Sequence, residues 1–378
     1  MFNKSTYQAA KIVAPTIVNL FADHLKRAKE RGEEDLAAVP DTNIIESIID
    51  AAFWASLRRE EGNSPKISLA FLPPDLAGQP LLFEKRIKVS PAALTKLAPG
   101  VERAGIHLGV WHQGDELYIW GTTHKIPNYC FVLDVSEPGL LVIKHRRVTG
   151  YGKFVNVAVL IGDQVKIVDE DSAHLQDCPE VLSSLLGFTS AGDDSVNILI
   201  QLAVSMRAHK HGGTLLVVPA GTSNWRESIL QPMKYSVLPA FCGLSDLIKQ
   251  DNTQRVNSFW QSELIREIES IGGLTAVDGA TILSDQHELL GFGAKIIRPQ
   301  GKNMIAQIMV TEPIVGGDAK IVNPVNSGGT RHISAAQFVH DQRDSLALVA
   351  SQDGHFTIFI WSPCENMVHA HRIDCLLV

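Results

Sequence analysis

Two stretches in the first half of the chain alternate apolar and polar residues on either side of a Gly-Asp pair. They are "HLGVWHQGDELYIWG" around Gly114-Asp115 and "KFVNVAVLIGDQVKIVD" around Gly162-Asp163. Gly and Asp tolerate the positive φ that tight hairpin turns require, so the sequence predicts two hairpins here. A helical pattern precedes them, with an apolar face over 44–57 and a cap at Asp41 or Thr42. This half therefore indicates an α+β domain with antiparallel hairpins.

The second half has a different order of signals. A helix is expected from a cap at 193–195 to about residue 209, followed by the buried strand "TLLVVP" and a helix over 253–270. Then come "TAVDGATIL", read as a strand interrupted by Asp278-Gly279, and the later strands "SLALVAS" and "FTIFIW". This order predicts an α/β domain with a mixed sheet flanked by helices.

These patterns, with a length of 378 residues, divide the chain into two domains. We expect a helix and a charged linker, "KRAKERGEED", over residues 1–40, a first domain over 41–175 and a second over 185–378.

Composition limits the partners and the compartment. The net charge of −7 argues against binding to a nucleic-acid polymer or to an anionic membrane. The N-terminal residues lack the apolar run of a signal peptide, and no later stretch approaches the roughly 20 apolar residues of a membrane span. The five cysteines form no C-x-x-C pair, which is typical of free thiols in a reducing compartment. We expect a cytoplasmic protein.

One glycine-rich stretch has the composition of a phosphate-binding loop: "SGGTRHISAAQF", Ser327–Phe338. Gly328 and Gly329 let backbone amides approach an anion, and Thr330, Arg331 and His332 add donors. A helix that starts at Ser334 or Ala335 would direct its free amides to the same place. The alternative is a turn in which Arg331 pairs with Asp341 or Asp344.

Two further stretches place acids next to strands. In "VDGAT", Asp278 is followed by Gly279 and Ala280, and such a carboxylate can bind a divalent metal; the alternative is a strand bulge with a solvated Asp. In "LVASQDGH", Ser351 and Asp353 follow a buried strand; the alternative is a plain hairpin that turns at Gly354.

The order of these three motifs resembles the diadenylate cyclase domain, the catalytic module of bacterial cyclic di-AMP synthases. That family has an Asp-Gly-Ala motif, an Arg-His-Arg motif preceded by Gly-Thr, and a Ser-Glu-Glu motif. The similarity covers about residues 185–378, where the motifs are "DGA" at 278–280, "GTRHI" at 329–333 and "SQD" at 351–353. Residues 41–175 resemble the sensor domains attached to divergent members of the family.

The resemblance implies a function and a set of site residues. Two ATP molecules would be joined into the second messenger cyclic di-AMP with release of two pyrophosphates, across a dimer or larger assembly of facing domains. Asp278, Arg331 and His332 would be catalytic, and Asp278 and Asp353 would hold Mg²⁺ or Mn²⁺. The nucleotide-binding residues would be Gly279, Ala280, Gly328, Gly329, Thr330, Ser351 and Asp353.

The chain departs from the family pattern at three positions. Ile333 stands where the family has its second arginine, and Gln352 and Asp353 stand where it has two glutamates. Lys295, Arg298 and Lys320 are cations that could replace the missing arginine. These departures leave two alternatives open: a catalytically silent nucleotide-binding sensor, and a related nucleotidyltransferase that makes another cyclic nucleotide.

Overall fold

The structure is a computed structural model that describes residues 5–146, 154–168, 198–250 and 258–377. The described residues divide into two compact units, one formed by 5–146 and 154–168 and the other by 198–250 and 258–377. Each unit has its own sheet, and both sheets contain parallel and antiparallel strand pairs. Among the described residues, no helix combines the length and the apolar character needed to cross a membrane.

The first unit contains an eight-stranded sheet in the order β2-β4-β3-β1-β5-β6-β7-β8. Neighbours β1 and β3 run parallel, and the other pairs run antiparallel. The strands are β1 (Ile67–Phe71), β2 (Leu81–Lys88), β3 (His107–Gln113), β4 (Glu116–Thr123), β5 (Phe131–Glu137), β6 (Leu140–Arg146), β7 (Phe154–Ile161) and β8 (Gln164–Ile167). The helical segments are α1 (Gln8–Glu30), α2 (Thr42–Ser56), α3 (Pro91–Leu97), η1 (Pro74–Leu76) and η2 (Ala98–Gly100).

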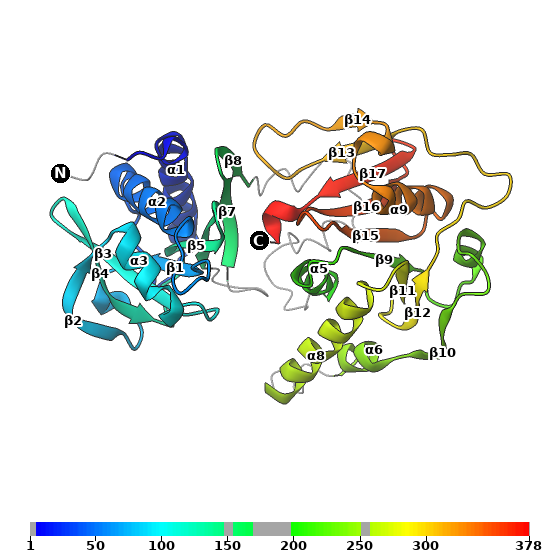
Figure 1. Ribbon diagram of the computed structural model, residues 1–378, viewed down its shortest axis with the longest axis horizontal. Helices are drawn as coiled ribbons and strands as arrows, with labels where there is room; N and C mark the ends of the chain where they lie inside the picture. Colours follow the sequence, from blue (N-terminus) through cyan, green and yellow to red (C-terminus); the bar gives the residue numbers. More distant parts are fainter. Residues whose placement is uncertain (1–4, 147–153, 169–197, 251–257, 378) are drawn as a thin grey trace. The chain divides into compact units, whose positions relative to one another are not determined.

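Local chemistry explains several boundaries in this unit. The two predicted hairpins are confirmed as β3–β4 and β7–β8, and Gly114 and Gly162 adopt φ of 59° and 58° at their turns. Helix α2 starts where predicted, because the Asp41 side chain accepts a hydrogen bond from the Ile44 amide at 2.9 Å. Helices α1, α2 and α3 cover one face of the sheet, where their apolar side chains form the main core (Figure 1).

The prediction of a charged linker after the first helix is wrong in part. The segment "KRAKE" forms the last turn of α1, and Ala28 in it is fully buried. Leu36 then forms a bridge with Asn128, which ties the following residues to the same unit.

The second unit contains a nine-stranded sheet in the order β10-β12-β11-β9-β15-β16-β17-β13-β14. Its strands are β9 (Gly213–Val218), β10 (Tyr235–Phe241), β11 (Ala280–Ser284), β12 (Leu289–Ala294), β13 (Ile308–Thr311), β14 (Lys320–Val322), β15 (Leu346–Ala350), β16 (Phe356–Ser362) and β17 (Met367–Arg372). Its helical segments are α5 (Ile198–Ala208), α6 (Gly243–Ile248), α8 (Ser258–Leu274), α9 (Thr330–Asp341), η4 (Asn224–Ser228), η5 (Pro324–Asn326) and η6 (Asp374–Leu376). The predicted caps at 193–195 and the start predicted at 253 lie outside the described residues.

Helices cover both faces of this second sheet. Leu215 and Val217 of β9 pack with α5, α6 and α8, whereas Leu216 and Val218 pack with α9. The same alternation in β15 separates Leu346 and Leu348 from Ala347 and Val349. Figure 1 shows α5 and α8 on one side of the strands and α9 on the other. The mixed sheet flanked by helices is therefore present in the second unit.

Two predicted boundaries near the motifs are wrong, and both corrections matter for the site. "TAVDGATIL" is not one interrupted strand, because β11 starts at Ala280 and Asp278 lies in the turn before it. The predicted helix after the glycine-rich loop starts at Thr330 rather than at Ser334 or Ala335. Arg331 and His332 therefore belong to the first turn of α9.

Candidate functional site

A pocket of about 830 Å³ lies in the second unit, where several strand ends meet the start of α9. Its wall includes Thr214 and Ala280 at the starts of β9 and β11, Ala350 at the end of β15, and Thr357 and Arg372 from β16 and β17. Pockets that bind small molecules commonly have volumes of about 300–1,000 Å³, so this pocket has the size for one nucleotide.

Every residue that the sequence predicted for the site lines this pocket. They are Asp278, Gly279, Ala280, Gly328, Gly329, Thr330, Arg331, His332, Ser351 and Asp353. The three motifs are separated by up to 75 positions in the sequence, and the sheet order β11-β9-β15-β16 brings them to one place.

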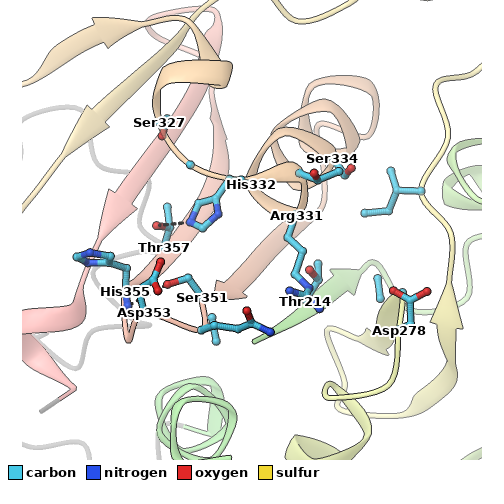
Figure 2. Close-up of a pocket in the computed structure, with 18 of the residues that line it drawn as sticks. Thr214, Asp278, Ser327, Arg331, His332, Ser334, Ser351, Asp353, His355 and Thr357 are labelled. Atoms are coloured by element: carbon cyan, nitrogen blue, oxygen red, sulfur yellow. Dashed lines mark hydrogen bonds between the residues drawn. The ribbon is translucent and has the colours of Figure 1, made fainter. Parts of the chain in front are cut away.

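Asp278 is presented by a tight contact between two backbone segments. Gly279 has a φ of +108°, and a Cβ added there would lie 2.5 Å from the carbonyl carbon of Gly293. The two glycines thus let β11 and β12 meet closely, while Ala280 pairs with Ala294. The Asp278 side chain is exposed and, in Figure 2, lies beyond the end of Arg331. It has no hydrogen bond or ion pair with any residue that the structure describes.

The start of α9 offers backbone donors to the pocket. Gly329 occupies the N-cap position and has no side chain that could cap the helix. Its carbonyl accepts from the amides of His332 and Ile333, whereas the amides of Thr330 and Arg331 have no acceptor among the described residues. Uncapped amides together with the positive end of the helix dipole attract anions.

Arg331 extends from this first turn across the pocket toward Thr214 (Figure 2). A Cβ added at Gly212 would lie 3.0 Å from Arg331 Nη1, so the guanidinium passes directly over that glycine. The alternative in which Arg331 pairs with Asp341 is not observed. Asp341 instead accepts from Gln337 Nε2 at 2.9 Å and lies 3.1 Å from His340 Nδ1.

His332 turns away from solvent into the wall behind the loop. It is 7% exposed, and its Nε2 lies 3.3 Å from the Thr357 hydroxyl (Figure 2). Burial, with smaller contributions from the nearby Arg372 and His355, lowers its pKa to about 4, so the ring is neutral at pH 7. A Cβ on Gly328 would lie 2.6 Å from this ring. Gly328 therefore allows the loop to pack on His332, a role that the sequence did not reveal.

The third motif forms the turn between β15 and β16. The Ser351 hydroxyl accepts from the His355 amide at 3.1 Å, and Gly354 adopts a φ of +84°. Gln352 Nε2 donates to the His211 carbonyl at 3.3 Å, a bond that a carboxylate at this position could not make. Asp353 is exposed on this turn. The hairpin alternative is thus correct for the backbone, and the turn also forms one wall of the pocket.

Two cations of the pocket complete its charge. Lys295, one of the three spare cations considered from the sequence, lines the pocket, but Arg298 and Lys320 are not among its lining residues. Arg372 also lines it, and this residue was not predicted. Its Nη2 donates to the Ser327 carbonyl at 3.0 Å. The pocket is lined by three cations and two carboxylates, so it is locally cationic in an acidic protein: the cations are Arg331, Arg372 and Lys295, and the carboxylates are Asp278 and Asp353.

The predicted metal ligands do not come together within one chain. Asp278 and Asp353 lie on opposite sides of the pocket in Figure 2. Among the described residues, no group of three or more His, Cys, Asp or Glu side chains is arranged to hold a metal ion. A single exposed carboxylate suits Mg²⁺ or Mn²⁺ when substrate phosphates and water supply the other ligands, as is usual for Mg²⁺. Asp278 fits that description.

Residues 34–124 match the sequence family described as "Probable sensor domain DACNV". The match covers α2, α3 and strands β1 to β4, which are neighbours in the sheet of the first unit. No curated protein is significantly similar to the chain in sequence. The first unit is thus similar to a probable sensor domain over about half of its length.

Proposed function

We propose that the second unit is a nucleotidyltransferase that joins two ATP molecules into cyclic di-AMP, and that the first unit regulates it. The composition of the pocket is the observation that supports this proposal most directly. An exposed carboxylate, an uncapped helix N-terminus and three cations share one cavity of nucleotide size. The similarity of residues 34–124 to a probable sensor domain supports the proposal, because such domains often accompany diadenylate cyclases.

The reaction would be an in-line displacement at the α-phosphorus of ATP by the 3′-hydroxyl of the second nucleotide. The hydroxyl loses its proton, the new P–O bond forms, and the bond to the leaving pyrophosphate breaks; two such steps close the ring. Phosphoryl and nucleotidyl transfer depend mainly on positioning and on neutralising charge. The amides of Thr330 and Arg331, with the Arg331 guanidinium, would hold the phosphates in place.

Asp278 would hold the divalent ion beside the reacting groups. A bound Mg²⁺ or Mn²⁺ neutralises phosphate charge and lowers the pKa of a hydroxyl. His332 would act from behind: its neutral ring supports the loop at 327–329, and its contact with Thr357 keeps that loop in place. Its burial favours this supporting role over a direct contact with phosphate.

The reaction needs a second copy of the chain. Each pocket would bind one nucleotide, as the resemblance to the diadenylate cyclase domain implies, and the product contains two. Two pockets would therefore face each other, so that the hydroxyl bound in one copy meets the α-phosphorus bound in the other. Asp353, exposed on its turn, could then serve the partner's nucleotide rather than the Asp278 of its own chain.

A silent nucleotide-binding sensor is the second candidate, and Gln352 favours it. Its amide is bonded to the His211 carbonyl, so the position lacks the negative charge that the family has there. The third candidate is a related nucleotidyltransferase that joins nucleotides other than ATP.

To test all three candidates, the purified chain is incubated with ATP, GTP, CTP and their mixtures in the presence of Mg²⁺ or Mn²⁺, and the released pyrophosphate is measured.

We expect pyrophosphate from ATP alone, in a ratio of two per cyclic product. Pyrophosphate released from another nucleotide, or only from a mixture, would mean that the substrate is that nucleotide or mixture rather than ATP alone. No release from any nucleotide, with ATP still bound in calorimetry, would establish the silent sensor.

A further inference from the structure

Arg372 is the last residue of β17 and lies 45 positions after the glycine-rich loop that it contacts. In the register of the sheet it pairs with Thr357, the residue that bonds to His332. Its Nη2 donates to the carbonyl of Ser327, which directly precedes Gly328 and Gly329. This hydrogen bond holds the guanidinium next to the loop residues that directly precede the first turn of α9.

Most of the hydrogen-bonding capacity of Arg372 remains open to a ligand. A guanidinium has five N–H donors, and the contact with Ser327 accounts for one hydrogen bond among the described residues. Arg372 lines the pocket and is partly exposed. The planar fork of arginine matches phosphate oxygens, and such charge-assisted bonds are about twice as strong as neutral ones.

The surroundings of Arg372 favour an anion. His332 is neutral, and the amides of Thr330 and Arg331 are uncapped. Ile333, by contrast, is not among the residues that line the pocket. Arg372 thus supplies this cavity with a cation that Ile333 does not supply.

We propose that Arg372 is a phosphate-binding residue of this pocket and, with Arg331, holds the polyphosphate chain of a nucleoside triphosphate between two guanidinium groups. Arg331 approaches from the α9 side over Gly212, and Arg372 approaches from the β17 side over Ser327. The inference rests on the proposed function for the identity of the ligand. It concerns binding, so it can be tested without turnover.

The test uses the full chain and compares Arg372→Gln and Arg372→Lys with wild type in calorimetry against ATP, inorganic triphosphate and adenosine. Lys320→Gln is the matched control, because Lys320 is an exposed cation of β14 that does not line the pocket. We expect Arg372→Gln to weaken ATP and triphosphate binding by about 10- to 100-fold. Arg372→Lys should lose less affinity for ATP and triphosphate than Arg372→Gln. Both Arg372 variants should bind adenosine as the wild type does, and Lys320→Gln should bind all three ligands as the wild type does.

The outcomes separate this inference from the proposed function. Unchanged ATP binding in Arg372→Gln would overturn it, and so would an equal loss for adenosine, which would mean that Arg372 acts through the shape of the loop. Failure of the wild type to bind ATP or triphosphate would overturn it as well. Wild-type binding without turnover, weakened in Arg372→Gln, would support the inference and contradict the cyclase.

Discussion

At the scale of single residues, Arg331 decides whether the glycine-rich loop binds phosphate. Replacing it with Ala removes a guanidinium that has no ion pair among the described residues, so the change should cost little stability. We predict that Arg331→Ala weakens ATP binding by about 1.5–3 kcal/mol, the usual contribution of a hydrogen bond to a charged group. Calorimetry measures this directly, with Arg298→Ala, an exposed cation outside the pocket, as the control. Equal affinity in the wild type and Arg331→Ala would return this loop to a plain turn.

His332 links the site to pH. Its pKa in the folded chain is lowered to about 4 by burial, below the ordinary value of about 6.5. The unfolded chain therefore binds the proton first as pH falls. The stability that His332 contributes is complete above about pH 6.5 and is lost between that pH and about 4.

As the pH falls through this range, the unfolding free energy of the wild type should drop. We predict that the drop is smaller in His332→Gln, by on the order of 2–3 kcal/mol. Denaturant unfolding at pH 7 and pH 4.5 measures the difference, and nuclear magnetic resonance gives the pKa of His332 itself. Titration of the His332 ring near pH 6.5 would show that the ring is solvated in solution and does not support the loop from within.

At the scale of elements, the close backbone contact between Gly279, just before β11, and Gly293 in β12 determines where Asp278 lies. Gly279→Ala would place a Cβ 2.5 Å from the Gly293 backbone at a φ that side chains rarely adopt. We predict a loss of about 2–4 kcal/mol in unfolding free energy, from backbone strain and overpacking together. Gly273→Ala in α8 is the matched control, since nothing lies within 4 Å of its Cβ position. A Gly279→Ala variant as stable as wild type would mean that the two segments are further apart.

Patterns within a few residues were sufficient for the elements whose cause is local. The hairpins at Gly114 and Gly162 and the start of α2 at Asp41 follow from turn and cap chemistry. The predicted start of α9 is wrong because Gly328 and Gly329 look like loop residues, although Gly328 packs on His332 and Gly329 occupies the N-cap position of α9.

Contacts between distant segments could not be read from the chain. Strand β17 was not predicted, since "MVHAHR" lacks the apolar character of its neighbours, and its place between β16 and β13 depends on sheet register. Arg372 was missed for that reason. Short edge strands such as β14, which is largely exposed, also give a weak signal. The candidate residues themselves came from the order of three motifs, and the fold added the cations and the supporting contacts around them.

At the scale of the whole molecule, the chain combines a unit similar to a probable sensor domain with a unit that contains the candidate site. If one pocket binds one nucleotide, turnover depends on the meeting of two chains. We predict that activity per chain rises with protein concentration until the dimer or larger assembly is complete, and then becomes constant. Activity assays and sedimentation over the same concentrations test this. Constant activity per chain in a solution of monomers would contradict the need for facing pockets.

The proposed function requires that Asp278 and the loop at 327–332 form a working cyclase. The most direct measurement is mass spectrometry of the small molecules formed from ATP with Mg²⁺ or Mn²⁺ by the wild type, Asp278→Asn and Asp318→Asn. Asp318 is an exposed acid that does not line the pocket, so it controls for the loss of a charge. We predict cyclic di-AMP from the wild type and Asp318→Asn, and none from Asp278→Asn, which should still bind ATP. Equal product from Asp278→Asn, or no cyclic di-AMP from the wild type, would contradict the proposed cyclase function.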